Sequence, residues 1–158
     1  MEYIDEIVYL EKLFNVVCKA LNQKSLLENE YFDIVTGSNY NHYIELDLNK
    51  KNAISLRLYL NSEAVTIDID RASEGYVFDI EFIKNNEDYF INFIRMLFTS
   101  IIEVEYCGRY YTKIYFKNME GKVLETLKYV TFFYWRKNCI TKKYLPIFPH
   151  TSKVEIKT

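Results

Sequence analysis

Glycine and proline are scarce in this sequence, with four glycines and two prolines among 158 residues. This scarcity, and the lack of any polar low-complexity tract, excludes a disordered chain or a long flexible linker. No apolar run approaches the roughly 20 residues that span a bilayer, so no association with a membrane is expected. Acidic side chains also stand near the N-terminus, where a signal peptide carries lysine or arginine. We therefore predict a single domain over residues 1–158, located in the cytoplasm.

Cysteine is rare as well, and its spacing bears on both metals and disulfides. The three cysteines, Cys18, Cys107 and Cys139, are odd in number, lie far apart in the sequence and form no CxxC pair. This pattern indicates neither a zinc site nor a disulfide framework, so free thiols are expected. Cys18 falls on the apolar face of a predicted helix and should be buried. Cys107 precedes Gly108, where a turn leaves room for exposure.

The motifs that usually accompany catalysis are missing. The sequence contains no GxxxxGKS/T phosphate loop, no GxGxxG fingerprint, no GxSxG elbow and no HExxH pair. Of the two histidines, His42 shares the inward parity of Ile44 and is predicted to pack at a strand end. His150 follows Pro149 and has no acidic neighbour in the sequence. We therefore expect a protein that is not an enzyme, with no catalytic residue, no cofactor and no bound metal.

An α+β fold is predicted from changes in hydrophobic periodicity along the chain. Between Tyr3 and Leu21, apolar residues recur at alternating steps of four and three, which places them on one face of a helix. A second helix is expected from Asn86, a favourable capping residue, to about Thr99. Apolar side chains surround most of this second helix, so it should lie across the apolar face of a sheet.

Strand patterns fill the sequence between and after these helices. Alternating apolar and polar residues predict five strands, joined by short polar turns, at 31–36, 42–48, 53–60, 64–70 and 76–82. Strands connected in this way form an antiparallel meander with one face open to water. Further strands are predicted at 101–107 and 110–117, followed by a hairpin turn at 118–122. The stretch 123–135 fits either a helix or a strand, and a strand from 123 to about 128 is favoured. An irregular stretch at 144–149 and an edge strand at 153–158 complete the prediction.

The net charge is −2, but the two signs are divided unequally along the chain. Residues 1–105 contain nineteen acidic and nine basic side chains, a net of −10, whereas residues 106–158 contain three acidic and eleven basic ones, a net of +8. Asymmetry of this kind points to an interaction partner rather than to a fold. An alternative within the molecule is that the basic third covers the acidic part.

Acidic residues occupy the polar positions of the predicted meander, with Arg57 as the cation between them, so they should gather on its open face. A small acidic protein without catalytic motifs is similar in these respects to bacterial toxin-immunity and other inhibitory proteins. The leading hypothesis is a non-enzymatic module that presents this face to a basic protein, such as a toxin domain or a nucleic-acid enzyme. The partner-binding residues would be Glu45, Asp47, Asp68, Asp70, Asp79 and Glu81. A third hypothesis is a metal-dependent enzyme that uses these carboxylates.

The basic part supports an alternative, which is nucleic-acid binding through segment 106–143. Its stretch GRYYTKIYFK, from Gly108 to Lys117, interleaves aromatic residues with cations. Aromatic rings on a sheet can stack on bases while lysine and arginine hold phosphates. The residues expected to do so are Arg109, Tyr111, Lys113, Tyr115 and Lys117. A structural alternative is that every second aromatic residue packs in the core and the lysines lie on the surface.

Overall fold

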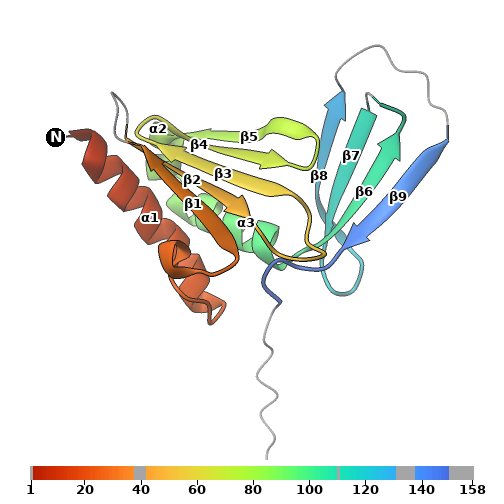
Figure 1. Ribbon diagram of the computed structural model, residues 1–158, viewed down its shortest axis with the longest axis horizontal. Coiled ribbons are helices and arrows are strands. Elements are labelled where there is room, and N and C mark those ends of the chain that lie inside the picture. Colours follow the sequence, from red (N-terminus) through yellow and green to blue (C-terminus); the bar gives the residue numbers. More distant parts are fainter. Residues whose placement is uncertain (1, 38–41, 110, 131–137, 150–158) are drawn as a thin grey trace, which may run out of the picture.

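The computed structural model describes residues 2–37, 42–109, 111–130 and 138–149, and its fold is α+β, as predicted (Figure 1). The elements are α1 (Glu2–Ala20), the 3₁₀ turn η1 (Leu26–Glu28), β1 (Phe32–Gly37), β2 (Tyr43–Leu48), β3 (Leu56–Asn61), β4 (Ala64–Ile69), β5 (Ala72–Asp79), α2 (Ile80–Asn85), α3 (Glu87–Thr99), β6 (Ile101–Cys107), β7 (Tyr111–Lys117), β8 (Val123–Val130) and β9 (Cys139–Tyr144). Among the described residues, no helix is long and apolar enough to cross a membrane.

Strands β1 to β5 form the predicted antiparallel meander, in which each strand pairs with the next one along the chain. The register keeps apolar side chains in rows on one face, because successive residues of a strand point to opposite faces. Leu46 pairs with Leu58, and Leu58 pairs with Ile67 on its other side. All three side chains are fully buried, so this face forms one wall of the core.

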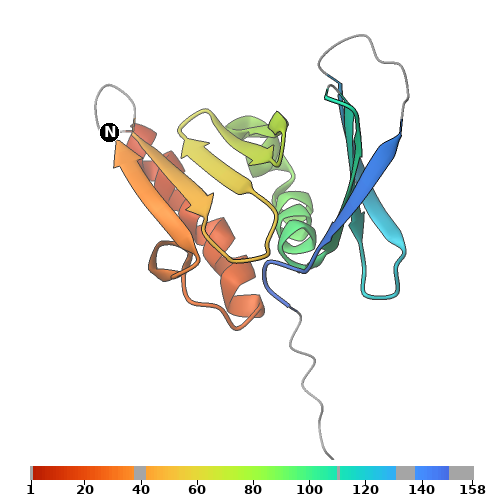
Figure 2. The same ribbon diagram turned by 45° about the vertical axis from the view of Figure 1, so that its right-hand side comes forward.

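Helices α1 and α3 cover the apolar face of the meander: α3 lies behind the strands in Figure 1, and α1 lies behind β1 in Figure 2. Their apolar residues recur at helical spacing, which turns one stripe of each helix toward the strands. The two helices meet through Phe14, whose ring centroid lies 5.8 Å from that of Phe90 and 6.5 Å from that of Phe98. The expectation of a helix packed on the apolar face of the sheet is therefore confirmed.

The remaining strands form a second, four-stranded sheet in the order β8-β7-β6-β9. Its inner face contributes Ile102, Val104, Ile114 and Phe116 to the same buried cluster as the meander and helices. The chain then returns from β9 to the first sheet, where the backbone N–H of Phe148 donates to the carbonyl oxygen of Phe98 at 2.9 Å. The two sheets therefore share one buried core.

The sequence misplaced the elements around the end of the meander. The strand predicted at 76–82 is present as β5, but it covers Ala72–Asp79, and residues 80–82 belong to α2 instead. Asp79 is the N-cap of that helix, and its Oδ1 accepts from the backbone N–H of Phe82 at 2.7 Å. Strand β4 ends at Ile69 because Asp70 has a φ of 54°, which no strand residue adopts.

In the last third, the strands β6, β7 and β8 lie where the sequence predicted them, while β9 was not predicted. The edge strand expected at 153–158 falls outside the described residues. So do residues 131–137, which follow the predicted strand from 123.

Candidate functional site

The open face of the meander carries the candidate site. Alternation along β1 to β4 turns four carboxylates and one guanidinium away from the core, and Figures 1 and 2 show no described element lying over this face. We call this surface the acidic face and define it by Asp33, Glu45, Asp47, Arg57 and Asp68. Four negative charges surround one positive charge, so the face has an excess of negative charge.

Arg57 lies at the centre of the acidic face and organises it. Its Nε is 2.7 Å from Oδ1 of Asp47 and 3.2 Å from Oε1 of Glu45, and its side chain is half exposed. The hydrogen bond that Arg57 donates to Asp47, followed by the charges of Asp47, Glu45 and Asp68, raises the pKa of Arg57. Asp68 is the direct cross-strand partner of Arg57 from the other side. The Arg57 guanidinium therefore lies between carboxylates of both neighbouring strands, β2 and β4.

Asp33 adds a charge to the acidic face and was not among the predicted partner-binding residues. It is exposed on β1 and lies directly opposite Asp47 in the β1–β2 register. Opposed residues of like charge destabilise a strand pair, and Asp47 is already engaged by Arg57. Asp33 itself accepts a hydrogen bond from Nδ2 of Asn49 at 3.1 Å. The acidic face therefore contains a like-charge pair that the fold does not need.

Aromatic and apolar side chains lie beside these charges. The rings of Tyr43 and Tyr59 are stacked, with centroids 5.3 Å apart. Tyr59 is the cross-strand partner of both Glu45 and Thr66, which places it in the middle of the face. Val35 and Val77 belong to the same row and are 52% and 55% exposed. Exposed apolar groups among polar ones are typical of surfaces that bind proteins.

The structure separates two of the acidic residues that the sequence grouped with Asp68, and it places a third at the end of β5. Asp70 lies in the turn after β4, Asp79 caps α2, and Glu81 is exposed on α2 itself. The prediction that these residues face the same side as Asp68 is therefore wrong for Asp70 and Glu81, whereas Asp79 pairs with Ala64 at the end of β5 and shares the side of Asp68. The physical reason is that the strand alternation was extended through a left-handed residue and through a helix start. Glu45, Asp47 and Asp68 do lie on one face.

Lys84 follows Asp79 and Glu81 closely in the sequence, so its placement also bears on the metal-dependent hypothesis. The Nζ of Lys84 lies 2.7 Å from Oε1 of Glu6 on α1. This ion pair joins α2 to α1 and does not belong to the acidic face.

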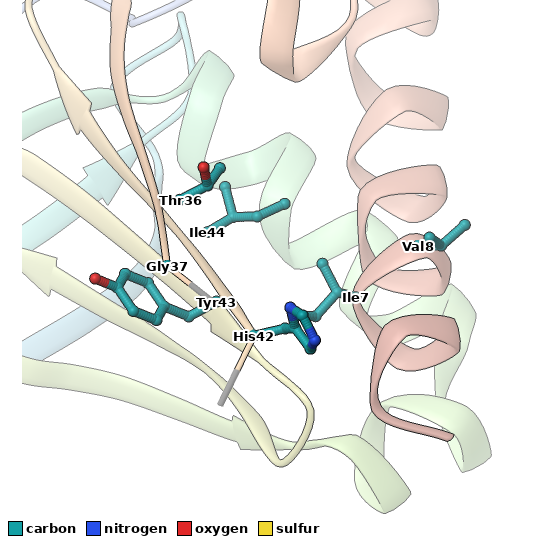
Figure 3. Close-up of a pocket in the computed structure, with 7 residues that line it drawn as sticks. All are labelled: Ile7, Val8, Thr36, Gly37, His42, Tyr43 and Ile44. Atoms are coloured by element: carbon teal, nitrogen blue, oxygen red, sulfur yellow. The ribbon is translucent and has the colours of Figure 1, made fainter. Parts of the chain in front are cut away.

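His42 lies at the far end of the meander, beside the N-terminal helix. It is exposed, whereas the sequence predicted that it packs at the strand end. Figure 3 shows His42 next to Ile7, at a surface pocket of about 300 Å³, with Tyr43 on the opposite side of the strand. Because successive strand residues alternate, Tyr43 reaches the acidic face and His42 does not.

The outer face of the second sheet brings together four of the five residues of the nucleic-acid alternative. Tyr111, Lys113, Tyr115 and Lys117 alternate along β7 and are half-buried. Lys113 lies directly opposite Lys128 of β8, a residue that the sequence analysis missed. We call this surface the basic face and define it by Tyr111, Lys113, Tyr115, Lys117 and Lys128. The Nζ atoms of Lys113 and Lys117 lie 4.6 and 5.8 Å from the ring centroid of Tyr115.

Two glutamates lower the positive charge of the basic face. Glu103 Oε2 lies 2.8 Å from Nζ of Lys117, and Glu105 is the cross-strand partner of Lys113. Arg109, the fifth residue of the alternative, lies away from this face at the end of β6, beside Arg71.

The cysteines differ most from expectation. Cys107 and Cys139 are direct partners in the β6–β9 register and form a disulfide, so the prediction of free thiols is wrong for this pair. Cys107 is also fully buried, not exposed. Cys18 is a buried free thiol, as predicted, and burial raises its pKa to about 11. A thiol with so high a pKa is a poor nucleophile at neutral pH.

Glu105 lies next to the disulfide, and its ligand atom and the two sulfurs fall within 4.8 Å of one another. A metal would need these sulfurs as thiolates. Because the sulfurs are bonded to each other, this group carries no metal hypothesis.

Comparisons with protein-family models, with curated proteins and with solved structures found no match for this chain.

Proposed function

We propose that this protein is a non-enzymatic binding module, of the inhibitor or immunity type, that presents its acidic face to a basic protein. The observation that carries the proposal is the composition of the open face of the meander. Four carboxylates surround a single guanidinium there, next to a stacked tyrosine pair and two exposed valines. A toxin domain or a nucleic-acid enzyme has the basic surface that this face would complement.

The two kinds of side chain would contribute differently to such an interface. Tyrosines and valines supply apolar area that is buried on binding, and tyrosine is enriched at interface hot spots. Carboxylates speed the encounter with a basic partner and disfavour acidic ones. Arg57 holds Asp47 and Glu45 in place through its contacts of 2.7 and 3.2 Å. Side chains that are already ordered lose less entropy on binding.

The variant Asp33→Lys separates binding from stability. Because Asp33 opposes Asp47, a lysine there replaces a like-charge pair with an opposite-charge pair. We expect the free energy of unfolding to rise by about 0.2–1 kcal/mol. We expect affinity for the partner to fall by about tenfold, which corresponds to roughly 1.4 kcal/mol. Urea denaturation and isothermal titration calorimetry measure the two quantities. The product of the neighbouring reading frame is the first partner to test.

Glu120→Lys is the matched control, because Glu120 is exposed in the turn between β7 and β8 and undergoes the same change of charge. It should leave affinity unchanged. A partner that binds wild type, Asp33→Lys and Asp68→Lys equally would exclude the acidic face as the interface.

The basic face favours a second candidate function, the binding of single-stranded nucleic acid. The supporting observation is that Tyr111, Lys113, Tyr115 and Lys117 share one face of β7, with Lys128 across from Lys113. Such a face combines rings for base stacking with ammonium groups for phosphates.

If this second function is correct, Lys113→Glu should weaken the binding of a fluorescent oligothymidylate and reduce its dependence on salt. Loss of one phosphate contact lowers the slope of log affinity against log salt by roughly 1. Fluorescence anisotropy at several salt concentrations measures this slope. Lys12→Glu, at an exposed position on α1, is the control and should have no effect. Identical curves for both variants would rule out the basic face.

The predicted cytoplasmic location is part of the proposal and is linked to the cysteines. Cytoplasmic proteins keep their thiols reduced, whereas disulfides persist in oxidising compartments. A cytoplasmic protein would therefore hold Cys107 and Cys139 as thiols in the cell. Alkylation at the moment of cell lysis, followed by mass spectrometry, distinguishes the two states.

A further inference from the structure

A hollow of about 620 Å³ lies where the turn between β4 and β5 meets the ends of β6 and β9. Its lining residues are Arg71, Tyr106, Gly108, Arg109, Asn138 and Ile140. We call it the arginine hollow. It belongs to neither the acidic face nor the basic face.

Arg71 is oriented within the arginine hollow by contacts that leave its charge unneutralised. Its guanidinium carbon lies 4.6 Å from the ring centroid of Tyr106, and its Nη1 donates to the carbonyl oxygen of Gly108 at 3.5 Å. Within the described part of the chain, no carboxylate forms an ion pair with Arg71 or Arg109. A guanidinium has five N–H donors, so both side chains have donors to offer a ligand.

Tyr106 provides a neutral aromatic wall. Burial, the hydroxyl of Tyr144 and the carboxylate of Asp70 raise the pKa of Tyr106 well above its ordinary value. The ring therefore stays uncharged beside the Arg71 guanidinium. Asp70 lies near Tyr106, but it is not among the residues that line the arginine hollow.

The walls of the hollow are joined covalently. Gly108 follows Cys107, and Asn138 precedes Cys139, so the disulfide links the two segments that face each other across the hollow. Gly108 has a φ of +76°, and no atom lies within 4 Å of the position that a Cβ would take. The backbone there is therefore open to a ligand. A site whose walls are held in place loses less entropy when it binds.

We propose that the arginine hollow binds a phosphate monoester whose organic group rests on Tyr106 and Ile140. Two guanidinium groups suit a doubly charged phosphate, because each can donate paired hydrogen bonds to its oxygens. Ile140 is 71% exposed and supplies apolar surface beside the aromatic ring. The volume is in the range of sites for small organic molecules and exceeds what a bare ion needs. This site is independent of the function proposed for the acidic face.

The proposal is tested by isothermal titration calorimetry, in which the oxidised protein is titrated with phenyl phosphate. We expect saturable binding with one site per chain. Arg71→Gln and Arg109→Gln should each weaken it by about tenfold, because each removes a charge-assisted contact. Both residues are exposed, so the fold should survive, and circular dichroism checks this. Arg95→Gln, at an exposed position on α3, is the matched control and should bind like wild type.

Titration with inorganic phosphate shows whether the site recognises the phosphate group alone or also the organic group of a monoester. Inorganic phosphate should bind more weakly than phenyl phosphate, because it lacks the group that contacts Tyr106 and Ile140. Equal affinity for the two ligands would overturn the organic part of the proposal. No saturable binding, or equal weakening by Arg95→Gln, would overturn the site itself.

Discussion

Replacement of Phe98 by alanine is expected to lower the free energy of unfolding by about 3–5 kcal/mol. Phe98 is fully buried, and its ring contacts come from three distant parts of the chain. Its centroid lies 6.5 Å from Phe14 of α1, 6.3 Å from Phe32 of β1 and 5.2 Å from Phe148 after β9. Truncation would leave a cavity where α1, α3, β1 and the segment after β9 meet. Urea denaturation followed by circular dichroism measures the loss.

Phe82→Ala is the matched control, because it removes the same atoms from a ring that is 39% exposed on α2. Its cost should be clearly smaller, since less apolar surface leaves contact with the protein. Domains are stable by only about 5–15 kcal/mol, so Phe98→Ala alone can prevent folding. Phe98→Leu then provides a smaller loss that can still be measured. Equal losses for Phe82→Ala and Phe98→Ala would contradict the assignment of Phe98 to the centre of the core.

Loss of the Cys107–Cys139 disulfide is expected to lower the free energy of unfolding by about 3–4 kcal/mol. The bond closes a loop with a sequence separation of 32 residues. A cross-link over this distance removes many conformations from the unfolded chain. It also fixes β9, whose side chains are mostly exposed and contribute little apolar burial of their own. Cys139→Ser, compared with oxidised wild type in urea, measures the effect.

The control is the same comparison in the presence of a reducing agent, which breaks the disulfide of the wild type. Cys139→Ser and wild type should become equally stable once both are reduced, because the variant differs only by an exposed sulfur. Thiol titration of the unfolded, non-reduced wild type should count one free thiol, which is Cys18. A count of three would show that the disulfide does not form.

The parts of the fold that the sequence predicted share a clear periodic signal. Leu46, Leu58 and Ile67 alternate with polar residues, and the core face of the meander follows from that pattern alone. Helix α2 was missed because Phe78, Ile80 and Phe82 continue the spacing of a strand past its end. The contrary signal was Asp79, whose capping role becomes visible only with its hydrogen bond to Phe82. Strand β9 was missed because only its last residue, Tyr144, is buried, so its sequence shows no alternation of apolar and polar residues.

In the candidate surfaces too, the residues that follow a periodic pattern were predicted and the others were not. Parity correctly placed Glu45, Asp47 and Asp68 on one face, since all three lie within strands. Asp33 was missed because the pattern of the first strand is weak, although its register opposite Asp47 follows once β1 is recognised. The arginine hollow had no sequence signal. Arg71 and Arg109 lie 38 positions apart in the chain and meet only through the packing of one sheet against the turn of the other.

The connectivity of the two sheets implies an order of folding. Every pairing in the meander joins strands that are neighbours along the chain, whereas β9 reaches past β7 and β8 to pair with β6. Closing a longer loop costs more entropy, and nonlocal pairing slows folding. We therefore expect the meander to assemble early and β9 to dock last, onto an edge of β6 that stays open until then. In the oxidised protein, the disulfide between Cys107 and Cys139 is positioned to hold β9 in place after that final step.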